Sequence, residues 1–162
     1  MGFSRLFRQF NIKEIQMAAM SNYLENKLID ALLRGQTFTF PTTVYVALFT
    51  ANPTDSSAGT EVTGGSYARV AVACSMANFA GTQSAGSTTE SSGTSGTTSN
   101  NVALTFPAPT ANWGTITGAA IMDAATSGNV LLFGALSTPK AVNSGDAAPT
   151  FPVAAISYQI DN

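Results

Sequence analysis

The residue types that carry out most acid–base and metal chemistry are nearly missing from this sequence. It contains no histidine and one cysteine, Cys74. Histidine is the usual general base near neutral pH, and histidine and cysteine are the usual zinc ligands. We therefore expect no zinc site, no Cys/His catalysis and no intrachain disulfide. Because Cys74 follows the alternating run Val70-Ala71-Val72-Ala73, we interpret it as a small buried hydrophobic residue and not as a reactive thiol.

The carboxylates are scattered along the chain and do not suggest a catalytic pair. Two carboxylates converging on a sugar would permit glycoside hydrolysis. Asp55 and Glu61 flank a Gly/Ser loop, whereas Asp123, Asp146 and Asp161 lie near expected strand ends or turns. Such positions favour turn and surface roles. The Gly-x-Ser-x-Gly elbow and the phosphate-binding loop are also absent, so the sequence predicts no catalytic residue, no cofactor and no metal.

Two kinds of binding chemistry are weakly represented. Beyond the first 20 residues the only basic side chains are Lys27, Arg34, Arg69 and Lys140, which is too few for a nucleic-acid surface. No apolar run approaches the roughly 20 residues that span a bilayer. Trp113 admits two interpretations: a sugar-stacking platform in a receptor-binding protein, or the preferred one, an anchor at a sheet corner.

The first 20 residues combine aromatic and basic side chains. They hold three of the seven basic residues, and the phenylalanines follow the i, i+4, i+7 spacing that places side chains on one face of a helix. We expect residues 1–20 to form an arm that docks on a neighbouring protein. The expected partner-docking residues are Phe3, Arg5, Phe7, Arg8 and Phe10. The alternative is a start of translation at Met17 or Met20, because Lys13-Glu14 can be encoded by a ribosome-binding sequence.

One helix is predicted, over residues 22–34. Asn22 can cap it, Glu25 stands where a capping box would be completed, and Gly35 follows as a stop signal. Leucines at positions 24, 28 and 32 repeat every four residues and form an apolar stripe. We expect this face to pack on a sheet, with Leu28 at its centre.

From residue 37 onward the sequence indicates strands. The expected strands cover residues 44–49, 67–76, 102–106, 115–123, 130–136 and 154–160, with turns at 127–129 and 143–146. Residues 81–101 are nearly all Ser, Thr, Gly, Ala and Asn, which predicts a long exposed loop or, alternatively, an extended contact surface. The predicted fold is mainly β: an antiparallel sandwich or jelly-roll-like domain over residues 21–162, with one N-terminal helix and the arm.

The overall composition suits a subunit that is packed against others. Of 162 residues, 44% are hydrophobic and only 10% are charged, and the formal net charge is −2. An ordinary soluble domain carries roughly a quarter charged residues. A weakly charged surface offers little repulsion between neighbouring copies.

Several segments, in the same order along the chain, resemble a family of small tailed-bacteriophage virion structural proteins, often labelled phage structural or tail-fibre proteins. The segments include SNYLENKLID at 21–30, VYVALFT at 44–50, GGSYARV at 64–70, WGTIT at 113–117 and VNSGD at 142–146. The arm and the long Ser/Thr/Gly loop depart from the family pattern. The resemblance implies a non-enzymatic part of the virion without fixing its position there.

The first functional hypothesis is a homotrimeric capsid decoration or cement protein on the head surface. Its expected partners are the major capsid protein and copies of itself, and its mechanism is the binding free energy that it adds by bridging capsid subunits. The alternative is a tail or tail-fibre-associated structural protein that binds a host receptor. An envelope-degrading enzyme is the least supported hypothesis. Neither nucleic acid nor membrane is expected as a partner.

Overall fold

The computed structural model describes residues 11–12, 15–17, 19–82, 86–92 and 94–160. Its elements are β1 (Ile15–Met17), β2 (Ala19–Met20), α1 (Asn22–Leu33), β3 (Thr43–Ala51), β4 (Thr60–Glu61), β5 (Val70–Ala73), β6 (Thr97–Ser99), β7 (Leu104–Thr105), β8 (Gly114–Met122), β9 (Val130–Val142), β10 (Thr150–Phe151) and β11 (Ile156–Gln159). The expected docking residues Phe3, Arg5, Phe7, Arg8 and Phe10 lie outside the described residues.

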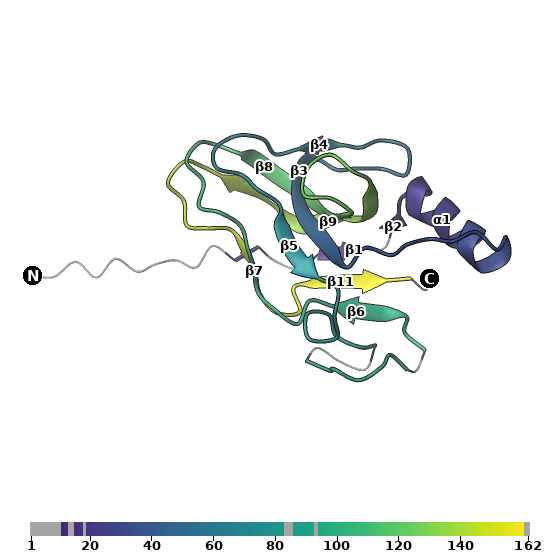
Figure 1. Ribbon diagram of the computed structural model, residues 1–162. Coiled ribbons are helices and arrows are strands. Elements are labelled where there is room, and N and C mark those ends of the chain that lie inside the picture. The colour runs from purple at the N-terminus through teal and green to yellow at the C-terminus, as the bar shows by residue number, and fades with distance from the viewer. Residues whose placement is uncertain (1–10, 13–14, 18, 83–85, 93, 161–162) are drawn as a thin grey trace, which may run out of the picture.

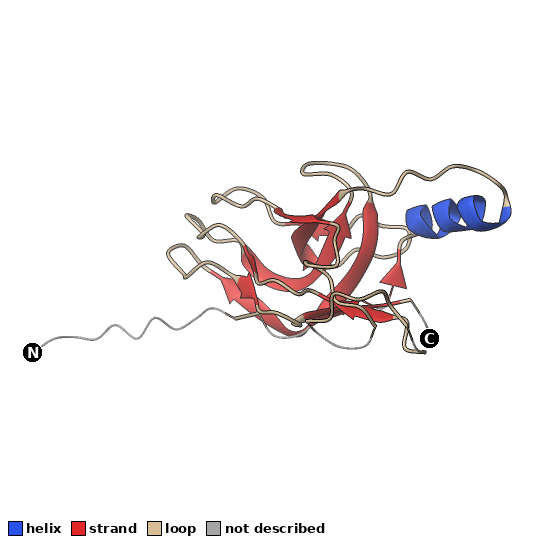
Figure 2. Cartoon of the chain, turned by 60° about the horizontal axis from the view of Figure 1, so that its bottom comes forward, coloured by secondary structure: helices blue, strands red, loops and turns tan. Residues whose placement is uncertain are grey.

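A large sheet forms the body of the molecule. Its strand order is β4-β3-β8-β9-β1-β11-β6, β2 also pairs with β9, β5 also pairs with β3, and β7 and β10 form a separate pair. All of these pairings are antiparallel except the one between β1 and β11. The prediction of a mainly β, antiparallel fold with one helix near the N-terminus is confirmed (Figures 1 and 2).

Strand β9 joins the two parts of this sheet. Its residues from Val130 onward pair with β8, whereas Leu136 pairs with Ile15 of β1 on its other side. In Figure 1, β3, β8 and β9 form the upper part, and β11 and β6 the lower part. Register shifts between β8 and β9 bend the long strand, as bulges do. The bend lets apolar side chains from both parts face one interior.

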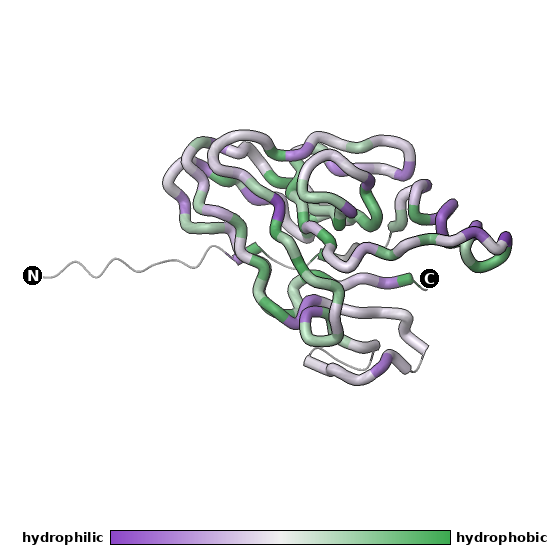
Figure 3. The backbone as a smooth tube through the Cα atoms, viewed as in Figure 1, coloured by the Kyte–Doolittle hydropathy of each residue, from purple (hydrophilic) through white to green (hydrophobic). Residues whose placement is uncertain are grey.

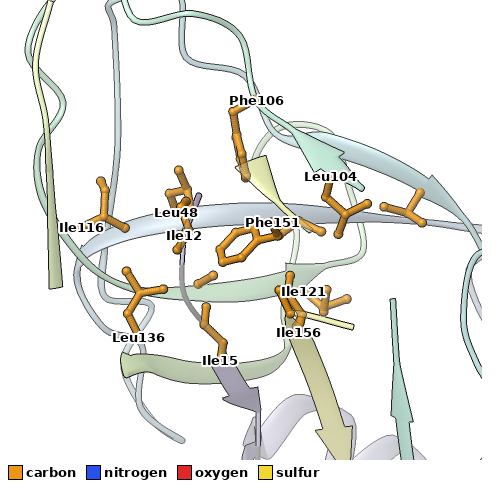
Figure 4. Packing of buried hydrophobic residues seen from close by; sticks show 14 of the residues in the cluster. Ile12, Ile15, Leu48, Leu104, Phe106, Ile116, Ile121, Leu136, Phe151 and Ile156 are labelled. Atoms are coloured by element: carbon orange, nitrogen blue, oxygen red, sulfur yellow. The ribbon is translucent and has the colours of Figure 1, made fainter. Parts of the chain in front are cut away.

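The core fills that interior (Figure 4). Side chains from far apart in the sequence meet there, and the largest of those that are fully enclosed are Phe106, Phe151, Ile12, Ile15, Leu48, Ile116 and Ile156. Ile12 is 2% exposed and Ile15 is 1% exposed. The described part of residues 11–20 therefore belongs to the β domain. The domain begins earlier than the predicted boundary between residues 20 and 21.

The β8–β9 hairpin shows why the predicted turn at 127–129 forms. Ser127 and Gly128 have φ angles of 53° and 76°, and two successive positive φ angles suit the right-handed twist of the strands that they connect. The two carboxylate oxygens of Asp123 accept hydrogen bonds from the backbone N–H and the side-chain Nδ2 of Asn129, each at 2.7 Å. Asp123 is thus a turn residue, as expected.

The helix forms where it was predicted, but its cap and its packing differ from the prediction. The N-cap is Ser21, whose Oγ accepts a hydrogen bond from the Leu24 N–H at 3.3 Å; the Ser21 hydroxyl also donates to the Val130 carbonyl, which fixes the helix start on β9. No residue of α1 is buried. Leu28 is only half-buried and Leu32 is 79% exposed, so the expected packing of the whole stripe on the sheet is wrong.

The predicted loop at 81–101 is shorter than expected. Its last part contains β6, which pairs with β11, and the fully enclosed Asn100. The Asn100 side chain donates to the carbonyls of Val102 (2.8 Å) and Pro152 (2.7 Å) and accepts from the Ile156 N–H (2.9 Å). These bonds use both the nitrogen and the oxygen of its side-chain amide. Asn100 therefore holds the start of β11 in place and is part of the fold.

Candidate docking site

A partly buried polar cluster joins the GGSYARV segment to β4. We call Glu61, Tyr67 and Arg69 the polar cluster. Arg69 Nε and Nη2 donate to the two oxygens of Glu61 at 2.8 and 2.7 Å, and the Arg69 side chain is only 6% exposed. Arg69 Nη1 also donates to the carbonyls of Ala124 (2.6 Å) and Ser127 (2.8 Å). Arg69 therefore links the β4–β5 loop to the β8–β9 turn.

Tyr67 completes the polar cluster. Its hydroxyl donates to Glu61 Oε1 at 3.0 Å and accepts from the Leu48 N–H at 2.9 Å. Burial is the main reason that the pKa of Tyr67 lies well above its ordinary value, and the neighbouring Glu61 carboxylate raises it further. Every group in the cluster is partnered, which is the arrangement of a structural network and leaves no free acid or base.

Trp113 is part of the same packing. Its indole Nε1 donates to the Gly65 carbonyl at 2.9 Å, and its ring meets Tyr67 edge-on with centroids 5.3 Å apart. Trp113 is 5% exposed, so a sugar ring cannot stack on it. The preferred interpretation, an anchor, is confirmed, and the sugar-platform alternative is wrong.

A different kind of site lies beside α1. A groove of about 400 Å³ runs between the helix, the segment that follows it and the β6–β11 edge. We call it the apolar groove, since its lining is almost entirely hydrophobic. Its walls include Leu24, Leu28, Phe38, Phe40, Leu132 and Tyr158. A volume of this size is in the range of ligand sites and can accept more than one bulky apolar side chain.

Two residues of the groove carry polar atoms of interest. Tyr158 is 4% exposed, and its hydroxyl has no hydrogen-bond partner among the described residues. Burial also raises the pKa of this hydroxyl, so it stays protonated near neutral pH. Cys74 lines the groove and is exposed, which corrects the prediction that it is buried; partial burial raises the pKa of its thiol and disfavours the thiolate.

Exposed hydrophobic side chains are found on α1 and at the groove. Ile29 is 51%, Leu32 79% and Leu33 82% exposed on α1, and Phe40 (61%) and Ile160 (71%) stand at the groove itself. Figure 3 shows the hydrophobic colouring at the tip of the helix. Monomeric proteins seldom expose contiguous apolar surface of this kind, and where they do it marks an interaction site.

Two further kinds of site were sought among the described residues. Among them, no three His, Cys, Asp or Glu side chains come close enough together to hold a metal ion. No helix in the described part of the chain is long and apolar enough to cross a bilayer. The walls of the groove can therefore bury apolar surface of a partner.

Comparison with known families shows the family to which the chain belongs. The sequence profile of the family described as "Podophage GP4 fiber I protein gp80" matches residues 19–159. The chain belongs to this family. Membership in the Gp80 family makes it a phage virion structural protein and confirms the resemblance drawn from its motifs. Comparison with curated proteins gave no match.

The Gp80 match spans the polar cluster and most of the apolar groove, and it leaves out residues 1–18. Sequence analysis missed the groove because its walls come from distant positions such as Leu24, Phe40 and Tyr158. One feature of the sequence does point to the groove. Apolar residues at 28, 29, 32 and 33 make the apolar face of α1 wider than a single contact with a sheet would cover. The docking role assigned to the arm stays a prediction, because its residues lie outside the described chain.

Proposed function

We propose that this protein is a non-enzymatic structural subunit of a phage fibre that is held in place by apolar contacts with other subunits. The observation that carries the proposal is the match of residues 19–159 to a phage fibre family. The apolar groove and the exposed leucines of α1 supply a surface for such contacts. Binding at this surface would remove apolar area from water, which is the main driving force of stable association.

The fibre role is preferred here to capsid cement, which the composition had suggested first. The family description names a fibre. A weakly charged surface suits any subunit packed among others, so it does not distinguish the two roles. The fibre reading favours a location at the tail. The major capsid protein as partner and the homotrimer remain proposals, and they belong to the cement alternative.

The experiment is a count of copies in purified virions. Quantitative mass spectrometry would compare the abundance of this protein with that of the major capsid protein, and gold-labelled antibodies against it would locate it by electron microscopy. We expect a small number of copies and labels on fibres at the tail. An abundance close to that of the major capsid protein, with labels spread over the head, would refute the fibre role and support cement.

A further inference from the structure

The apolar groove leaves hydrophobic side chains uncovered at the surface. Apart from Tyr158, its walls offer an occupant little but hydrocarbon, and exposed Phe40 and Ile160 stand at the site. The enclosed Tyr158 hydroxyl has no partner among the described residues. An unpartnered buried donor is costly in a folded protein. Hydrocarbon walls of this kind suit an apolar protein segment whose aromatic side chains they can enclose.

The chain itself contains such a segment outside the described residues. Residues 1–10 include Phe3, Leu6, Phe7 and Phe10. The described chain begins at Asn11, which is bridged to Thr150. Asn11 borders a second pocket, whose other lining residues are Ile12, Ser137 and residues 152–155, and none of these lines the apolar groove. The described residue nearest to the segment therefore lies on a different part of the surface from the groove.

We propose that residues 1–10 of one copy fill the apolar groove of the next copy. This inference rests on the proposed structural role and names the contact through which that role is carried out. The phenylalanines of the arm supply aromatic side chains for the hydrophobic walls of the groove. Burying aromatic side chains in a preformed pocket is the usual source of a strong interface anchor.

The direction of the chain favours a neighbouring groove over the copy's own groove. Strand β1 runs parallel to β11, with Ile15 opposite Ile156 and Met17 opposite Tyr158. Strand β2 then ends at Met20, a residue of the groove wall. An arm entering its own groove would have to reverse at Asn11 and retrace this path. Ten residues reach about 35 Å when fully extended, so little length would remain for docking.

The geometry of the contact has a consequence for assembly. The arm and the groove are different surfaces of the same chain, so each copy offers one arm and one groove that can receive an arm. A contact between unlike surfaces repeats from copy to copy and produces a ring or a filament. A contact of one groove region with the same region of another copy would instead stop at a dimer. The arm-to-groove contact thus suits a fibre.

The test uses the full-length protein, because Ile12 and Ile15 are core residues and a truncation beyond residue 10 would damage the fold. The arm variant carries Phe3→Ser, Phe7→Ser and Phe10→Ser. The groove variant carries Cys74→Trp, which fills an exposed position of the groove wall; Leu28→Lys is a second groove variant. Circular dichroism and thermal melting would verify that each variant is folded.

Sedimentation velocity over a range of concentrations gives the readout. Wild-type protein should form species that grow with concentration, and the arm and groove variants should each be monomeric. Loss of three aromatic anchors should weaken association at least about a hundredfold. An equimolar mixture of the arm and groove variants should form a dimer and nothing larger, because one intact arm and one intact groove remain.

Three results would overturn the proposal: wild-type protein that is monomeric throughout, an arm variant that assembles like wild type, or a mixture that stays monomeric. The control is Ala141→Lys, a substitution at an exposed position of β9 outside the groove wall. It should leave assembly unchanged, and a loss of assembly in this variant would place the contact on another part of the domain. The copy number in virions is measured separately, so failure of this contact and failure of the fibre role are distinguishable.

Discussion

Tyr67 and Tyr158 are both largely enclosed, but their hydroxyls differ in hydrogen bonding. The Tyr67 hydroxyl donates to Glu61 and accepts from the Leu48 N–H. The Tyr158 hydroxyl has no partner among the described residues, and it sits at a groove flanked by exposed hydrophobic side chains. The polar cluster is fully hydrogen-bonded within one chain, whereas hydrophobic side chains at the apolar groove remain exposed. The difference separates the part of the molecule that stabilises the fold from the part that is available for assembly.

The largest expected effect comes from breaking the polar cluster. Arg69→Met leaves the Glu61 carboxylate and two backbone carbonyls without their donor, and loss of one partner of an enclosed ion pair costs about 3 kcal/mol or more. Urea unfolding measures the loss. The matched control is Arg34→Met, which breaks the Asp30–Arg34 pair, whose Arg34 side chain is 70% exposed, and should cost less than about 1 kcal/mol. Equal losses would contradict a structural role for the polar cluster.

The two tyrosines allow a direct comparison by one substitution. Tyr67→Phe removes a hydroxyl with two hydrogen bonds and should lower the free energy of unfolding by about 1–3 kcal/mol. Tyr158→Phe removes an unpartnered hydroxyl and should leave stability unchanged or slightly higher in the unassembled protein. Urea unfolding of both variants is the measurement. A clear loss for Tyr158→Phe would mean that its hydroxyl already has a partner.

Alkaline pH should weaken the fold through both tyrosines. Burial raises the pKa of each hydroxyl in the folded state, whereas an unfolded tyrosine titrates near pH 10. Above about pH 10 the folded state binds more protons than the unfolded state, so stability is complete below that pH and falls as the pH rises. The loss should reach about 1 kcal/mol per tyrosine at pH 11. Tyr158→Phe should remove the contribution of Tyr158 to this pH dependence. Measuring the free energy of unfolding at pH 8 to 11 for wild type and variant would show it.

The smallest effect is expected on the outer face of α1. Leu32→Ala should change stability by less than about 0.5 kcal/mol because the side chain is 79% exposed. Leu28→Ala, at a half-buried position, should cost about 1 kcal/mol, less than the 2–5 kcal/mol of a filled core site. Leu136→Ala, at a core position, provides that reference. A loss of core size for Leu32→Ala would place α1 against the sheet after all.

The central strands were predictable because their physical signals are local. Segments around β3, β8 and β9 are rich in β-branched and apolar residues and are bounded by turn signals, and the Ser127-Gly128 turn needs small residues that accept positive φ angles. Short strands carry too few residues for a pattern to form. Strand β1, for example, is three residues long and was assigned to the arm.

The groove could not be predicted for a different reason. The leucine spacing of α1 determines that a helix forms and that one face is apolar, but not what covers that face. The answer depends on where Phe40 and Tyr158 arrive in three dimensions, which periodicity does not encode. The burial of Trp113 was expected, because a tryptophan beside turn residues is usually an anchor whose indole N–H finds an acceptor.

The parallel pairing of β1 with β11 also sets the order in which the protein can mature. Ile15 lies opposite Ile156, so the sheet joins the first described strand to the last, and contacts so distant in sequence form slowly. During synthesis the early strand must wait until residues near 156 have left the ribosome. The groove is completed by Met20 and Ile160 from these same two regions. Incomplete chains consequently lack the receiving surface, and only finished subunits can be added to a growing assembly.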